Sequence, residues 1–359
     1  MRSRTVVVTC LAVLLAAGAA LAGGTVEEVT FYSEALGEER SVLVYLPEVY
    51  ESSSDSYPVV YLIGTWMDGG PGAWLSPQPG FHHEQLDQMI GDGLIDPVIL
   101  VEVDPNASPW APDLPLRLPA FMTDSELTGN HETAMVEDLV PWIDANYRTL
   151  TDREHRYVCG DSAGGYSAAR LAFRHWDLFG GLLTQVGTIA IETHMAAIPL
   201  ILAEYPGGPP YTFYPTAGQW SLYGFTWCAA MTPNLSNPPW NVDFWLDQDG
   251  QIVPDDAARY FSQSASRWAA EMAAAGGRVE IFMSAGDEDF YLPFTTYFAN
   301  DLDTLEIPYT LHMFHGDHDT TLFRPHLTFF MPLKATAESP NRVFNPNRWW
   351  PMQEFVLEL

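Results

Sequence analysis

A serine between glycines could supply a nucleophile in this chain. Ser162 is the centre of Gly160-Asp161-Ser162-Ala163-Gly164, a G-x-S-x-G motif. An apolar run (157–159) precedes the motif, and apolar residues at helical spacing follow it. A buried strand that turns sharply into a helix is the setting in which this motif presents a nucleophilic serine. The glycines fit such a turn because side chains at those positions would clash.

The motif alone permits two other interpretations. A serine before a helix can cap that helix with its hydroxyl and do no chemistry. The run GDSAGG is also similar to the GDSGG of trypsin-type proteases, which need an all-β barrel and a His and an Asp upstream of the serine. The helix-forming run after Ser162, and the strands and helices that alternate around it, argue against the protease.

A nucleophilic serine needs a base and a group that orients the base. In α/β sheets that carry this chemistry, the residues follow in the order Ser, Asp or Glu, His, each in a loop after a strand. Asp289 follows a strand predicted at 278–283, and His318 follows a strand predicted at 309–314. The sequence therefore predicts a catalytic triad of Ser162, Asp289 and His318.

These loops leave two alternatives open. Asp287 lies two residues before Asp289 and is a second candidate for the acid. His312, His315 and His318 are close in sequence and could be metal ligands. No matching His or Cys cluster stands elsewhere, and the H-x-H-x-D-H run of zinc hydrolases is incomplete, so neither a metal site nor a cofactor is predicted.

The elements that must position these residues alternate between strands and helices. The first two strands have the pattern of an antiparallel pair, and unbroken apolar runs such as 58–63 indicate strands covered on both faces. We therefore predict an α/β fold with a mostly parallel sheet, flanking helices and a site at the carboxyl ends of the strands. Strands are expected at 25–33, 40–46, 58–63, 97–103, 278–283 and 309–314, and helices at 83–90, 131–147, 257–275, 294–305 and 323–330.

The alternation breaks between about 189 and 255, a region rich in Trp, Tyr and Pro. A stretch of this length is expected to be an insertion with its own packing, in the position of a cap. Its aromatic residues would fill the core of the insertion or form a binding wall for an aromatic or sugar-containing substrate. The predicted organisation is a hydrolase domain at 23–335 that contains this insertion, followed by a C-terminal tail at 336–359.

The first 22 residues have the features of an export signal. Arg2 and Arg4 make a basic start, residues 6–19 are apolar, and Ala20-Leu21-Ala22 fits a signal-peptidase site. No later stretch is long and apolar enough to span a bilayer. We expect a signal peptide at 1–22 and a secreted or periplasmic protein without membrane insertion.

The chain has 46 acidic and 16 basic residues and a net charge of -30. The acidic residues are spread along the chain, which indicates a solvated acidic surface. Such a field repels nucleic acid and anionic membranes, so a nucleic-acid partner is excluded.

Two cysteines, Cys159 and Cys228, lie after the predicted signal peptide. An exported protein could join them in a disulfide. A cysteine in a buried strand, however, commonly serves as a small apolar residue, and we expect both to be unpaired.

Several stretches resemble the esterase D / putative esterase family of α/β-hydrolases. This family includes feruloyl and acetyl-xylan esterases, S-formylglutathione hydrolases, siderophore esterases and mycolyltransferases. The resemblance implies the α/β-hydrolase fold and spans most of 40–327. The stretches that carry it are SVLVYLPEVY, YPVVYLIGT, DPVILVEVD, EDLVPWIDANYRT, YVCGDSAGGYSAARLAFRHWDLFGGLLTQVG, GDED and HGDHD.

The resemblance also implies a role for each site residue. The oxyanion hole would consist of the backbone N–H groups of Ala163 and Trp66. Family members usually have His-Gly or Asp-Gly where this chain has Gly64-Thr65, so Thr65 stays an alternative donor to Trp66. The implied roles in the triad are Ser162 as nucleophile, His318 as base and Asp289 as orienting acid.

The predicted function is an exported serine carboxylic ester hydrolase that forms an acyl-enzyme. Its substrate would be a small-molecule or carbohydrate-linked ester. One alternative is an acyltransferase of the mycolyltransferase type, which passes the acyl group to a sugar hydroxyl. A second is a catalytically silent, esterase-like protein that binds a ligand with its aromatic insertion.

Overall fold

A computed structural model describes residues 23–65, 74–76, 78, 82–106, 119–204, 219–238, 240–247 and 250–318. The signal peptide predicted at 1–22 and the tail predicted at 336–359 lie outside the described residues. The helix predicted at 323–330 and the candidate oxyanion donor Trp66 lie outside them as well.

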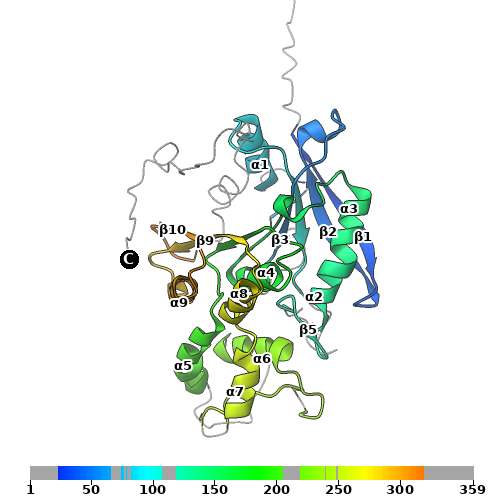
Figure 1. Ribbon diagram of the computed structural model, residues 1–359. Helices are drawn as coiled ribbons and strands as arrows, with labels where there is room; N and C mark the ends of the chain where they lie inside the picture. The colour runs from blue at the N-terminus through cyan, green and yellow to red at the C-terminus, as the bar shows by residue number, and fades with distance from the viewer. Residues whose placement is uncertain are drawn as a thin grey trace, which may run out of the picture.

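Eight strands form one sheet in the order β1-β2-β4-β3-β7-β8-β9-β10 (Figure 1). β2 runs antiparallel to both of its neighbours, β1 and β4, and every other neighbouring pair is parallel. The predicted fold, a mostly parallel sheet with an antiparallel start, is confirmed. The strands are β1 (Thr25–Ser33), β2 (Glu38–Leu46), β3 (Val59–Ile63), β4 (Ile99–Val103), β7 (Arg156–Asp161), β8 (Gly181–Gln185), β9 (Glu280–Gly286) and β10 (Thr310–Phe314), and a separate hairpin joins β5 (Asp124–Ser125) to β6 (Gly129–Asn130).

Helices cover both faces of this sheet, as the unbroken apolar runs of its central strands require. Tyr61 and Val158 point to the face that packs against the helical run at 131–146, α4 and α8. Val60 and Leu100 point to the opposite face, where α1 supplies buried Leu86. The helices are α1 (His82–Gly91), α2 (His131–Thr133), α3 (Val140–Asn146), α4 (Ser162–Arg174), α5 (Ile198–Glu204), α6 (Gln219–Met231), α7 (Pro254–Phe261), α8 (Ala265–Ala274) and α9 (Leu292–Thr304).

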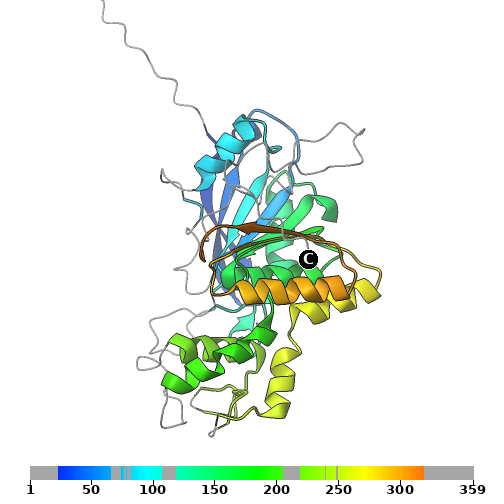
Figure 2. The same ribbon diagram turned by 90° about the vertical axis from the view of Figure 1, so that its left-hand side faces the viewer.

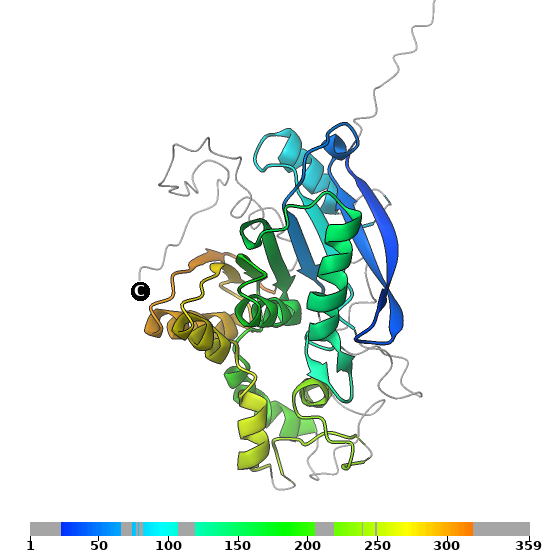
Figure 3. The same ribbon diagram turned by 45° about the vertical axis from the view of Figure 1, so that its right-hand side comes forward.

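The region at 189–255 is helical at 191–204 and 219–231, and its described residues between 232 and 253 form turns and isolated bridges. A 3-10 helix (Ile191–Ala197) leads into α5, and α6 follows further along the chain. Together with α7, these helices form one group at the bottom of Figures 1, 2 and 3, away from β1 and α1. Trp227 and Trp245 in this group are 0% and 1% exposed. Core packing is therefore the role of these two tryptophans.

The helix predicted at 131–147 contains a π-helical segment at Ala134–Leu139 between α2 and α3. Pro141 explains the wider turn because proline has no N–H to bond the carbonyl four residues earlier, and its ring crowds that carbonyl.

The helix predicted at 257–275 is interrupted after Phe261. There the Ser262 hydroxyl donates to the Arg259 carbonyl at 2.6 Å, which competes with the helical ladder.

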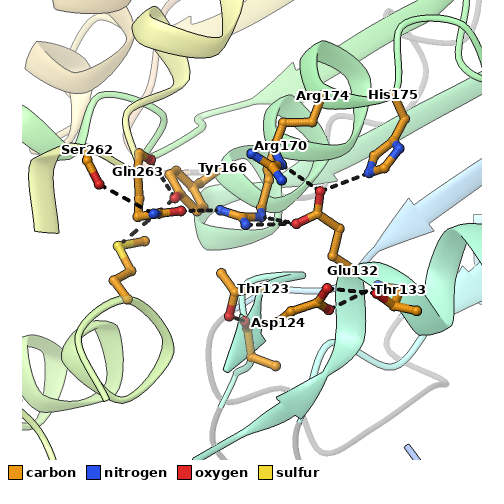
Figure 4. A network of polar contacts seen from close by, with 12 residues as sticks. Thr123, Asp124, Glu132, Thr133, Tyr166, Arg170, Arg174, His175, Ser262 and Gln263 are labelled. Atoms are coloured by element: carbon orange, nitrogen blue, oxygen red, sulfur yellow. Dashed lines mark hydrogen bonds and ion pairs between the residues drawn. The ribbon is translucent and has the colours of Figure 1, made fainter. Parts of the chain in front are cut away.

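A buried ionic network fixes α4, the helix that begins at Ser162 (Figure 4). The Glu132 carboxylate accepts hydrogen bonds from Nη2 of Arg170 at 2.7 Å and from Nε of Arg174 at 2.6 Å. It also lies 2.8 Å from Nε2 of His175. Burial alone would raise the pKa of the Glu132 carboxyl, but the His175 hydrogen bond and the two arginine charges outweigh it and lower the pKa to about 2. Glu132 therefore stays ionised and ties the helix to the neighbouring α2.

Cys159 and Cys228 are buried free thiols, which confirms the expectation that they do not pair. None of the helices in the described part of the chain has both the length and the apolar character needed to cross a membrane.

Candidate active site

Ser162 lies on a strained turn between β7 and α4. Its φ angle is 48°, in the left-handed region that a residue with a side chain rarely adopts. Such a conformation costs on the order of 1–3 kcal/mol and persists when the surrounding structure imposes it. Here the Thr188 N–H donates to the Ser162 carbonyl at 2.9 Å, which ties the turn to the loop after β8. Because the turn directly follows β7, the Ser162 hydroxyl lies at the carboxyl edge of the sheet.

The two motif glycines permit the close packing around this turn. A Cβ on Gly160 would collide with the Gly164 carbonyl. A Cβ on Gly164 would collide with the carbonyl oxygens of Ile63 and Gly64, at the end of β3. The steric reason predicted for both glycines is confirmed. The contact also places the start of the loop after β3 directly beside α4.

The structure brings Ser162, His318 and Asp289 into one hydrogen-bonded line. The Oγ of Ser162 lies 2.9 Å from Nε2 of His318, across 156 residues of sequence. The Nδ1 of His318 lies 2.9 Å and 3.0 Å from the two carboxylate oxygens of Asp289. The side chain of Asp289 is 1% exposed and that of His318 is 29% exposed. The acid is therefore shielded, while the imidazole keeps access to solvent.

This geometry decides which ring nitrogen of His318 carries a proton. An ionised carboxylate can only accept hydrogen bonds, so Nδ1 of His318 carries the proton that points to Asp289. Nε2 is then left to accept the Ser162 hydroxyl proton. The arrangement has the parts of an activated nucleophile: a hydroxyl, a base and an acid that orients the base.

Asp287, the alternative acid, faces a different histidine. Its carboxylate lies 3.2 Å from Nδ1 of His315 and accepts the Gly316 N–H at 3.1 Å. The His315 side chain is 73% exposed. The hydrogen bond from Gly316, followed by that from His315, lowers the pKa of Asp287. Asp287 thus stabilises the loop that leads to His318. Among the described residues, no hydrogen bond joins Asp287 to the imidazole of His318.

The candidate oxyanion donors are only partly described. Ala163 is the second residue of α4, so its N–H has no carbonyl within the helix to bond. It is 3% exposed and adjoins Ser162. Trp66 lies outside the described residues, and Thr65 is the last residue described before the gap at 66–73. Within the described ranges, no group of three or more His, Cys, Asp and Glu side chains could hold a metal ion.

Two residues toward the carboxyl edge of the sheet were not singled out from the sequence. Tyr291 packs its ring beside His318, with ring centroids 4.9 Å apart. Glu102 is a buried carboxylate on β4 that accepts the backbone N–H groups of Trp74 and Leu75, at 3.2 Å and 2.7 Å. A charged residue inside the apolar run ILVEV was the signal available for Glu102, whereas Tyr291 had no distinguishing pattern.

The sheet order, the strained serine between strand and helix, and the loops that carry Asp289 and His318 define an α/β-hydrolase. The chain belongs to the putative esterase family, because the model of that family matches residues 33–331.

Curated relatives include proteins named as esterases. An endo-1,4-beta-xylanase/feruloyl esterase of Xylanibacter ruminicola is 31% identical over 167 residues, which are 45% of this chain and 22% of that protein. An esterase of Mycobacterium tuberculosis is 28% identical over 190 residues, which are 50% of this chain and 38% of that protein. The match therefore spans less than half the length of either relative.

Solved structures share the fold at low sequence identity. A ferulic acid esterase has a TM-score of 0.59 and 18% identity, with 86% of this chain and 98% of that chain covered. An S-formylglutathione hydrolase from Agrobacterium tumefaciens has a TM-score of 0.54 and 17% identity, with 86% and 92% covered. A ferulic acid esterase from Anaeromyces mucronatus, in complex with ferulic acid, has a TM-score of 0.54 and 17% identity, with 87% and 91% covered.

Proposed function

We propose that this protein is an exported serine carboxylic ester hydrolase that works through an acyl-enzyme. The observation that carries the proposal is the line from Ser162 Oγ to His318 Nε2, at 2.9 Å, and from His318 Nδ1 to Asp289, at 2.9 Å. Membership of the putative esterase family supports ester chemistry for this line. Residues 1–22 would direct export, and the helices of the 189–255 region would form a cap over the site.

The proposed reaction has two halves. His318 Nε2 takes the Ser162 proton while Oγ forms a bond to the ester carbonyl carbon, and Asp289 stabilises the imidazolium that results. The bond from that carbon to the alcohol oxygen then breaks, and the imidazolium gives its proton to the departing alcohol. A water that loses its proton to His318 attacks the acyl-enzyme, and the acid leaves as Ser162 regains its proton.

The negative oxygen that forms during attack needs donors that are already in place. We assign this role to the backbone N–H groups of Ala163 and Trp66. One such donor contributes about 3–4 kcal/mol to stabilising the transition state. The close packing of Gly164 on the end of β3 supports the assignment, because it brings the start of the Trp66 loop beside the turn that carries Ala163.

The aromatic residues beside the triad favour a small-molecule or carbohydrate-linked ester with an aromatic acyl group. Phe290 follows Asp289 directly and is 64% exposed. Its ring lies 5.6 Å from that of Trp220, a half-buried residue of α6. An exposed ring that packs against a half-buried one, directly after Asp289, offers a stacking surface for a planar group. Esters of ferulic acid are the first substrates to examine, given the names of the relatives.

The test compares the wild-type protein with Ser162→Ala on p-nitrophenyl acetate and on a panel of feruloyl, acetyl-xylan and short-chain esters. We expect hydrolysis by the wild type and a loss of about 10⁴-fold or more in the variant. A fluorophosphonate probe should label the wild type and leave Ser162→Ala unlabelled. Full activity in Ser162→Ala, with circular dichroism unchanged, would exclude Ser162 as the nucleophile.

A further inference from the structure

Tyr291 touches both members of the Asp289–His318 pair. Its backbone N–H donates to Oδ1 of Asp289 at 2.7 Å. Its ring centroid lies 4.9 Å from that of His318, with an interplanar angle of 52°. The same Asp289 carboxylate lies 2.9 Å from Nδ1 of His318. One residue therefore supports the acid through its backbone and the base through its ring.

The ring of Tyr291 is itself held on two sides. Phe290 meets it at 5.3 Å and 89°, and Phe294 meets it at 5.5 Å and 65°. Phe294 is buried in the first turn of α9, and its N–H donates to the Tyr291 carbonyl at 2.9 Å. Burial, and then the charge of Asp289, raise the pKa of the Tyr291 phenol. The ring is thus a fixed, uncharged surface beside the imidazole.

The orientation of the His318 imidazole depends on such a neighbouring surface. It lies in the segment 315–318, which has no helix or strand, and its side chain is 29% exposed. The hydrogen bonds to Asp289 and Ser162 form together only when the imidazole plane has the observed orientation. In the proposed reaction the imidazole also gains a positive charge, and an aromatic ring within about 6 Å attracts a cation.

We propose that Tyr291 is a positioning residue: its ring holds the His318 imidazole in line with Ser162 and stabilises the imidazolium as it forms. The kinetic part of this inference rests on the proposed ester hydrolysis. The orientation of His318 rests on geometry alone and can be measured in the absence of any substrate.

The first experiment compares Tyr291→Leu, which removes the aromatic ring, with Tyr291→Phe, which keeps it. Tyr291→Leu should lower kcat by about 3- to 10-fold with KM little changed, because orientation and charge stabilisation act on the transition state. Tyr291→Phe should keep kcat within about 2-fold, since the phenol oxygen has no part in the argument. The matched control is Tyr297→Leu, which removes a 43% exposed tyrosine from α9, the helix that Tyr291 precedes. Wild-type kcat in Tyr291→Leu, or equal losses in the Leu and Phe variants, would overturn the inference.

A second replacement guards against a variant that fails to fold. A fluorinated phenylalanine in place of Tyr291 keeps the shape of the ring but withdraws electron density from its face. We expect kcat to fall below that of Tyr291→Phe while thermal unfolding stays the same. A kcat equal to that of Tyr291→Phe would show that the ring does not stabilise the imidazolium.

A spectroscopic measurement separates this inference from the proposed function. The His318 Nδ1 proton that points to Asp289 should give a far-downfield proton resonance, which His318→Gln abolishes. Tyr291→Leu should broaden it through exchange with water, and Tyr291→Phe should preserve it. A sharp resonance in Tyr291→Leu contradicts the positioning role whether or not the protein hydrolyses esters. Absent ester hydrolysis and absent fluorophosphonate labelling of the wild type would instead reject the proposed function.

Discussion

The carboxylate of Asp289 lies 2.9 Å from Nδ1 of His318, although 29 residues separate the two in sequence. The relationship depends on neighbouring parallel strands, because Asp289 follows β9 and His318 follows β10. A Cβ on Gly286 would collide with the carbonyl oxygens of Gly316 and Asp317, so the absence of a side chain there lets the two loops lie against each other. The two side chains therefore meet at the carboxyl edge of the sheet.

Replacing the acid separates Asp289 from Asp287. Asp289→Asn should lower kcat by about 10⁴-fold, because the amide favours the wrong imidazole tautomer and cannot stabilise the imidazolium. Asp287→Asn is the matched control, since it makes the same change two residues away beside His315. We expect kcat in that variant to stay within about 3-fold of wild type. Steady-state hydrolysis of p-nitrophenyl acetate decides between them, and a larger loss in Asp287→Asn would reverse the assignment.

Adding one methyl group at Gly164 should destabilise the fold. Gly164→Ala directs a Cβ at backbone carbonyls of β3, which cannot move aside as a flexible side chain could. We expect the free energy of unfolding to fall by about 2–3 kcal/mol. Gly91→Ala, at the end of α1, has no atom within 4 Å of its added Cβ and should leave stability unchanged or raise it by up to about 1 kcal/mol. Urea unfolding measures both, and equal midpoints would contradict the steric argument.

The Glu132 network should contribute strongly to stability. Glu132→Gln leaves the buried Arg170 guanidinium without its counter-charge, and losing one partner of a buried pair costs about 3–5 kcal/mol. Glu271→Gln is the control because the Arg267–Glu271 pair is more than half exposed on both sides. It should cost less than about 0.5 kcal/mol. Comparable losses in the two variants in chemical denaturation would mean that the network is no stronger than a surface pair.

Buried His194 should make the protein less stable as the pH falls. Burial lowers the pKa of His194 from 6.5 to about 3. Below pH 6.5 the unfolded chain binds a proton at this histidine that the folded protein does not bind. The free energy of unfolding therefore falls between pH 6.5 and pH 3, by about 5 kcal/mol in all. Burial lowers the pKa of His131 to about 4, in the same direction.

The measurement is urea unfolding of the wild type and His194→Gln between pH 7 and pH 4.5. The variant should show a shallower decline across this window, whatever its stability at pH 7. If the free energy of unfolding of His194→Gln declined with pH as steeply as that of the wild type, folding would not lower the pKa of His194.

The sequence by itself determined seven of the eight strands of the sheet and the position of the turn at Ser162, whereas β8 was not predicted. Both depend on local patterns: apolar runs long enough for buried strands, and glycines two residues on either side of the serine where backbone groups approach closely. The order of Asp289 and His318 after successive strands was also visible, because parallel strands deliver the loops that follow them to one edge.

Only the tertiary structure decided that Asp289, and not Asp287, lies against His318. The two aspartates share one loop, and the direction of each carboxylate depends on hydrogen bonds to the loop after β10, which no local pattern encodes. The same reason applies to Tyr291, whose ring meets His318 only because β9 and β10 are neighbours. It applies as well to buried Trp227 and Trp245, since burial is a property of the packed chain. Spacing along the sequence limits which residues can meet, and long-range packing decides which of them do.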